Sequence, residues 1–185
     1  MILTLMVAGT GMVMILPAFP LIEVKQLGLS NAQIGILLAV NSLTLMIVSE
    51  IWGRKLSESP TYVVNAFRLG MISIVGMVVI YATGKSFWLL LVANILCGIG
   101  GSALSVGWRL FAIKLNYSTD VLSGLHLLTC GLRGLYAPFL GAVLIALWNP
   151  QVALWAAAGL IATSVLILPP ISLISQAFIP TQVDL

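Results

Sequence analysis

Charge is scarce in this sequence. Only 7% of the 185 residues are charged, and five acids with a single histidine leave little material for hydrolysis or metal catalysis. The two cysteines, Cys97 and Cys130, fall in apolar stretches without metal-ligand spacing, so we interpret them as buried free thiols. Eight lysines and arginines are too few for a basic patch that binds nucleic acid. We therefore expect no metal, no other cofactor and no nucleic-acid partner.

Motifs of soluble enzymes are also missing. The sequence contains no G-x-x-x-x-G-K-[ST], no H-E-x-x-H and no G-x-S-x-G pattern. Gly98, Gly100 and Gly101 form a glycine-rich run inside an apolar stretch, where close helix packing explains them better than phosphate binding. No polar segment is long enough for a second domain. We expect one domain over residues 1–185 and no enzyme activity.

Long apolar stretches are what the chain has in abundance. Hydrophobic residues make up 61% of it, and a bilayer core of about 30 Å needs roughly 20 apolar helical residues to span it. Six stretches approach that length: 2–22, 32–52, 62–83, 87–108, 122–148 and 152–174. The short loops between them make consecutive helices antiparallel. The sequence therefore predicts an all-α membrane protein with six transmembrane helices.

The polar connections give the helix starts and the orientation. Ser30 or Asn31 is expected to cap the second helix, and Asn149-Pro150 to form the last turn. Lysine and arginine are more frequent in the second and fourth loops than on the opposite side, where only Lys25 and Lys85 occur. Because basic loops stay inside, both termini are predicted to be cytoplasmic.

Arg133 lies about eleven residues into the stretch 122–148. Inserting an arginine near a helix centre costs about 2.5–3.5 kcal/mol, and mid-bilayer charges usually mark pathways. His126 and Thr129 share its helix face. We favour a water-filled cavity in which Arg133 binds an anionic substrate group or a coupling partner. The alternative is a structural role in which Arg133 pairs with helix-end carbonyls or with an acid on another helix. No stretch offers an acid at a similar depth, because Glu50 lies near the end of the second stretch.

Other polar and small residues have two interpretations each. His126 lies nearer the surface, so it serves either an interfacial hydrogen bond or a proton relay. Asn41 and Asn94, near the middle of two stretches, most simply form interhelical hydrogen bonds, with cavity lining as the alternative. A small-residue stripe on the opposite face from Arg133 is expected to let a neighbouring backbone approach; it consists of Gly131, Gly134, Pro138 and Gly141.

The loop after the second stretch holds Gly53, Arg54, Lys55 and Glu58. Arg54, Lys55 and Arg109 are expected to anchor the protein at the interface, because their long stems let the charge reach the headgroups. Glu58 is a candidate partner for Arg109 across the cytoplasmic side.

Three segments together resemble the major facilitator superfamily of secondary transporters. PAFPLIEVKQLGLSNAQIG (Pro17–Gly35) resembles the end of an opening helix and the start of the next one. IWGRKLSES (Ile51–Ser59) is similar to a degraded form of the superfamily's loop between the second and third helices, with Gly53 and Glu58 in its Gly and Asp positions and no Arg cluster. GLHLLTCGLRGLYAPFLGAVL (Gly124–Leu144) resembles a signature on the eleventh helix of one bacterial branch.

The resemblance implies one six-helix half, the second, of a twelve-helix transporter in the bacterial inner membrane. It implies a small-molecule substrate, alternating access, and a partner that is either a separate second half or another copy of this chain. It also places Asn41, Asn94 and Arg133 towards the cavity. Two rival interpretations stay open: a non-transporting membrane scaffold or assembly subunit of a larger complex, and an inactive, truncated gene product.

Overall fold

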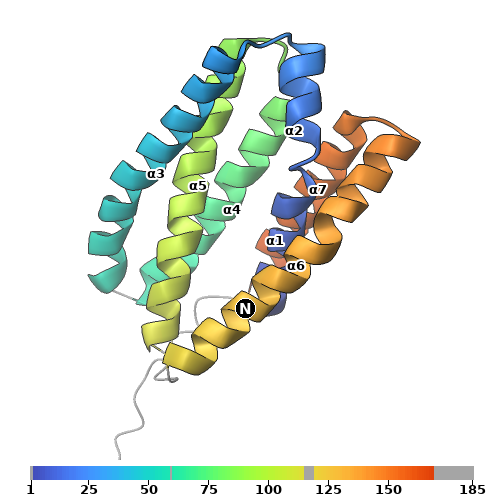
Figure 1. Ribbon diagram of the computed structural model, residues 1–185. Coiled ribbons are helices and arrows are strands. Elements are labelled where there is room, and N and C mark those ends of the chain that lie inside the picture. The colour runs from blue at the N-terminus through green and yellow to red at the C-terminus, as the bar shows by residue number, and fades with distance from the viewer. Residues whose placement is uncertain (1, 59, 115–118, 169–185) are drawn as a thin grey trace, which may run out of the picture.

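The computed structural model describes residues 2–58, 60–114 and 119–168, and all regular structure in them is helical (Figure 1). The elements are α1 (Ile2–Met14), α2 (Ala18–Pro20), the π-helix η1 (Leu21–Gln26), α3 (Asn31–Glu58), α4 (Pro60–Thr83), α5 (Phe87–Lys114), α6 (Thr119–Leu147) and α7 (Pro150–Ile167). Six spans are long and apolar enough to cross a membrane, and α1, α2 and η1 together form the first of them. The predicted all-α architecture with six such helices is confirmed.

The first span is broken in its middle. Pro17 and Pro20 carry no backbone N–H, and α1 ends at Met14. The amide of Ala18 donates to the Ile15 carbonyl at 2.9 Å, which closes a tight turn between α1 and α2. The helix then continues as η1 to Gln26, so the predicted start of a loop after residue 22 is wrong. Gly28, with φ of 61°, ends the span in the left-handed conformation that favours glycine.

Two of the predicted helix starts are confirmed by their hydrogen bonds. The Ser30 hydroxyl accepts from the Gln33 amide at 3.3 Å, while the Gln33 side chain accepts from the Ser30 amide at 2.9 Å. This reciprocal pair is a capping box at the start of α3. Asn149 accepts from the Val152 amide at 2.9 Å, with Pro150 as the first residue of α7. Short capped turns thus connect the antiparallel helices at these two points.

The ends of four further predicted stretches need correction. α3 continues through the predicted loop to Glu58, α5 continues past the predicted end at 108 to Lys114, and α6 ends at Leu147. α7 ends at Ile167, because Leu168 precedes Pro169 and adopts an extended backbone with ψ of 123°. Residues 169–174, which we assigned to the last helix, lie outside the described residues.

The spans pack as two related groups of three. In one group, α3 and α4 both pack extensively on α5; in the other, α6 and α7 both pack on α1. We number the six spans in chain order, with α1 as the first, α3 as the second and α7 as the sixth. If each span is replaced by the span three places along, the α3–α5 contact becomes α6–α1, and the α4–α5 contact becomes α7–α1. The α4–α7 contact joins the two groups, and the exchange of spans leaves this contact unchanged. Consecutive spans are antiparallel, so two spans that are three places apart also run in opposite directions. The two groups therefore have matching contacts but opposite orientations.

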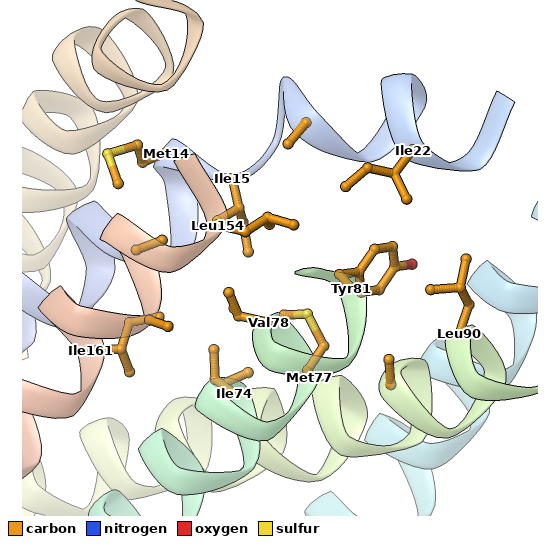
Figure 2. Packing of buried hydrophobic residues seen from close by; sticks show 14 of the residues in the cluster. Met14, Ile15, Ile22, Ile74, Met77, Val78, Tyr81, Leu90, Leu154 and Ile161 are labelled. Atoms are coloured by element: carbon orange, nitrogen blue, oxygen red, sulfur yellow. The ribbon is translucent and has the colours of Figure 1, made fainter. Parts of the chain in front are cut away.

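The main core lies where α1, α4 and α7 meet (Figure 2). Ile15 from the turn after α1, Ile74 and Val78 from α4, and Leu154 and Ile161 from α7 are fully buried there. The most exposed spans are α3 and α6, which carry exposed large apolar side chains along much of their length. Such surfaces are liabilities in water but ordinary in lipid. The fold is that expected of an integral membrane protein.

Close helix contacts within the group of α3, α4 and α5 depend on glycines. A methyl group on Gly98 would lie 2.7 Å from Thr44 Cβ and 2.8 Å from the Asn41 carbonyl, so α5 approaches the α3 backbone there. A methyl group on Gly100 would lie 2.7 Å from the Gly70 carbonyl of α4. The prediction that this glycine-rich run serves close packing is confirmed for these two residues.

Candidate functional site

A cleft of about 560 Å³ lies between α1, α5 and α6. Its volume falls within the usual range of small-molecule sites. Six of the residues singled out in the sequence line it: Gly101 and Arg109 from α5, and His126, Thr129, Cys130 and Arg133 from α6. The exposed residues Arg109 of α5 and Ser123 of α6 line one end of the cleft, which we call its mouth. The structure thus brings the predicted polar face of α6 into one cavity.

A row of contacts runs along this face of α6. The ring of Trp108 stacks on His126, with ring centroids 5.2 Å apart and planes 26° apart. His126 Nε2 lies 3.5 Å from Cys130 Sγ, and Arg133 Nη2 donates to the same sulfur at 2.9 Å. The Thr129 hydroxyl donates to the His126 carbonyl at 2.8 Å, so the helix backbone already uses that hydrogen. The row places the aromatic pair at one end and the guanidinium at the other.

Cys130 differs from our expectation of a buried thiol. It is free, only partly buried, and lines the cleft between His126 and Arg133. The spacing of four and three residues within His126, Cys130 and Arg133 was the available signal, because such neighbours meet on one helix face. Cys97 is also free and only partly buried, but it lies outside the cleft on α5, beside Asn41.

Gly9 of α1 makes room for Arg133. A methyl group at Gly9 would overlap the Arg133 guanidinium, including Nη1. The side chain of Arg133 is therefore directed from α6 towards α1 and is partly buried between the two helices. Nothing in the sequence pattern pointed to Gly9, because the contact joins residues far apart in the chain.

Asn41 and Asn94 do not line the cleft. Asn94 is 6% exposed, and its side-chain amide donates to Tyr81 Oη at 3.0 Å and to the Leu90 carbonyl at 2.9 Å. It therefore takes the interhelical role that we gave first, rather than the cavity-lining role. Asn41 of α3 lies against α5, where its backbone carbonyl approaches Gly98 and its side chain lies beside Cys97.

A second polar cluster joins three spans at the end of the bundle opposite the cleft mouth. Tyr81 of α4 is 4% exposed and donates from Oη to Glu23 Oε1 of η1 at 2.8 Å. Because Asn94 of α5 donates to the same hydroxyl, the Glu23–Tyr81–Asn94 cluster links η1, α4 and α5. Tyr81 appears in Figure 2 between η1 and α5. We missed this cluster because we had placed Glu23 in a loop.

Replacing Tyr81 with phenylalanine should lower the free energy of unfolding by about 1–3 kcal/mol, because the buried Asn94 amide and the half-buried Glu23 carboxylate each lose a hydrogen-bond partner. The measurement is an unfolding titration in mixed detergent micelles. Tyr62→Phe removes a hydroxyl from an exposed tyrosine on the same helix and should change stability far less. Equal effects of the two substitutions would contradict a structural role for the cluster.

The small-residue stripe of α6 packs only in part. A methyl group on Gly141 would overlap the carbonyl oxygen of Met14, so α6 and α1 meet there at backbone distance. Gly131 and Gly134 have open space around them within this chain. α1 instead covers a line through Cys130, the fully buried Ala137 and Gly141, which lies between our two predicted faces. Pro138 lies within α6 without ending the helix.

The basic residues after the second stretch lie on α3 itself. Arg54 forms an ion pair with Glu50 at 2.6 Å, and both side chains are exposed. Gly53 has open space around it, and Lys55 is exposed. The predicted pairing of Glu58 with Arg109 lies outside the described side chains. Arg109 is exposed and lines the cleft rather than serving only as an interfacial anchor.

Comparison with known protein families, curated proteins and solved structures finds no match to this chain. No family is therefore identified. The described residues define an all-α protein whose six long apolar helices indicate an integral membrane protein.

Proposed function

We propose that this chain is one six-helix half of a secondary transporter of the major facilitator type, which moves a small solute by alternating access. The matching contacts of the two three-helix groups support this proposal, because many transporters are built from three-helix repeats of opposite orientation. Both the internal repeat and the sequence resemblance thus favour the same class. No catalytic step is part of the proposal.

The observation that carries the proposal is the cleft with Arg133 in its wall. A permanent charge within a membrane span is costly, and such residues usually line a substrate or ion pathway. The first span is interrupted directly after the cleft residue Met12, between Met14 and Ala18. Discontinuous helices beside a central cavity are typical of transporter binding sites, because they bring free backbone groups to the solute.

A second six-helix body is part of the proposal. The cleft carries guanidinium, imidazole and hydroxyl groups, which are costly to expose to lipid. A second copy or a separate half is expected to cover it. The open surfaces at Gly131 and Gly134 leave room for close approach to such a body.

The cleft mouth lies at the same end of the bundle as Arg54, Lys55 and Arg109. The distribution of basic residues favours the cytoplasm for this end. We therefore propose a half-transporter in the bacterial inner membrane, with both termini and the open cleft on the cytoplasmic side. A scaffold subunit is the rival; it would have its polar face filled by partner side chains rather than open as a cavity of small-molecule size.

The assembly state and the transport activity of the purified protein test the proposal together. Native mass spectrometry should detect two six-helix bodies in one particle. Liposomes containing that particle, adsorbed on a solid-supported membrane, should give transient currents after jumps in the concentration of carboxylates or phosphates. A stable single copy without currents would contradict the proposal. A larger mixed complex without currents would support the scaffold instead.

A further inference from the structure

We propose that the cleft binds a small organic anion, namely a carboxylate or phosphate with an apolar body. This inference rests on the proposed transport function and names the substrate class of the same site. Three features of the cleft support it: its positive charge, the different depths of its two arginines, and its apolar lining.

The charge of the cleft is positive. Arg109 and Arg133 are its two permanent cations, and none of the described residues that line it is acidic. Arginine keeps its charge at all physiological pH values. Near a protein surface, a charge pair 4 Å apart interacts several times more strongly than in bulk water. A solute anion in this cleft is therefore stabilised, and a solute cation is repelled.

The two cations lie at different depths. Arg109 is exposed at the mouth, whereas Arg133 is partly buried between α6 and α1, one to two helical turns beyond His126. A solute that enters from the mouth meets Arg109 first and Arg133 last. The planar guanidinium of Arg133 matches the geometry of a carboxylate or phosphate, which can accept two parallel hydrogen bonds.

The wall of the cleft suits an apolar body on that anion. The stacked rings of Trp108 and His126 form a flat surface beside the polar row. Met12, Leu104 and Leu127 add apolar surface around it. An inorganic anion would leave these groups without contacts, whereas an organic solute buries them against its own carbon atoms.

Cys130 provides a built-in reporter of this environment. Its sulfur lies 2.9 Å from Arg133 Nη2 inside the cleft, while the chain's second cysteine, Cys97, lies outside it. A Cys97→Ser variant thus carries a single thiol in the proposed site. The matched Cys130→Ser variant, which keeps Cys97, measures any labelling elsewhere.

The experiment compares an anionic and a cationic thiol reagent on the detergent-solubilised Cys97→Ser protein. The reagents are methanethiosulfonate ethylsulfonate and methanethiosulfonate ethyltrimethylammonium, each normalised to its own rate with a free thiol in buffer. We expect the anionic reagent to be favoured by about fivefold or more, the factor that one charge a few ångströms away gives even in water. Arg133→Gln should lower the ratio severalfold, with Arg109 left as the remaining cation of the cleft. The thiolate fraction cancels in this ratio.

A protection measurement tests the organic part. Benzoate at millimolar concentration should slow the labelling of Cys130, whereas its neutral analogue benzamide should not. Equal protection by both, or no protection by benzoate, would overturn the inference.

The outcomes separate this inference from the proposed function. Equal normalised rates for the two reagents would reject anion selection, while still showing a water-filled cleft compatible with transport. If neither reagent reacts with Cys130 until the protein is denatured, the cleft contains no water, and both the inference and the proposed function fail.

Discussion

Replacing Arg133 with alanine should abolish transport while leaving the amount of protein in the membrane unchanged. The substitution removes the deep cation of the cleft, so the solute loses its strongest electrostatic contact. Insertion does not suffer, because an arginine near a helix centre opposes insertion by about 2.5–3.5 kcal/mol and alanine does not. The measurement is the solute-induced current in liposomes, together with the amount of protein in washed membranes.

Two further variants sharpen this prediction. Arg54→Ala removes the same side chain from an exposed position on α3, outside the cleft, and should leave the current nearly unchanged. Arg133→Lys keeps the charge but loses the planar fork, so it should retain part of the current. Unchanged transport kinetics in Arg133→Ala would end the proposed role of this residue.

Replacing Gly141 with alanine should lower the free energy of unfolding by about 1–3 kcal/mol, the usual cost of forcing atoms into a packed interface. The added methyl group would overlap the Met14 carbonyl oxygen, which belongs to the backbone and has no alternative rotamer. α6 and α1 must therefore separate. An unfolding titration of the purified protein measures the loss.

Gly131→Ala is the matched control on the same helix. Its methyl group would meet nothing within this chain, and alanine is the better helix former, so stability should stay the same or rise by about 0.5–1 kcal/mol. If Gly131→Ala destabilised the protein as much as Gly141→Ala, the difference in packing between the two glycines would be refuted. Both titrations are made on the dissociated single chain, because a methyl group at Gly131 would weaken any assembly that packs on this position.

The helices and their caps could be predicted from the sequence because the signals are local. The third span matches its predicted bounds, and Ser30 and Asn149 cap their helices through hydrogen bonds to residues three positions ahead. The break after Met14 was harder to predict from the sequence. Pro17 and Pro20 were visible, yet their effect on the end of the span depends on the π-helical turn that follows.

The orientation of α6 shows where local reasoning fails. The sequence placed a polar stripe and a small-residue stripe on this helix, but α1 packs on the line between them, through Ala137. Which line faces a neighbour depends on the other helices, and a helical wheel carries no such information. For the same reason we gave no functional role to Gly9, which lies beside Arg133, or to Trp108, which stacks on His126.

The Glu23–Tyr81–Asn94 cluster has a mechanical consequence. It joins η1, α4 and α5 at one end of the bundle, whereas the cleft lies towards the opposite end, where α5 meets α6 through the stacked rings of Trp108 and His126. We therefore expect the helices to resist separation more at the end that holds the cluster than at the end that holds the cleft. Motions that change the width of the cleft should then be largest at its mouth.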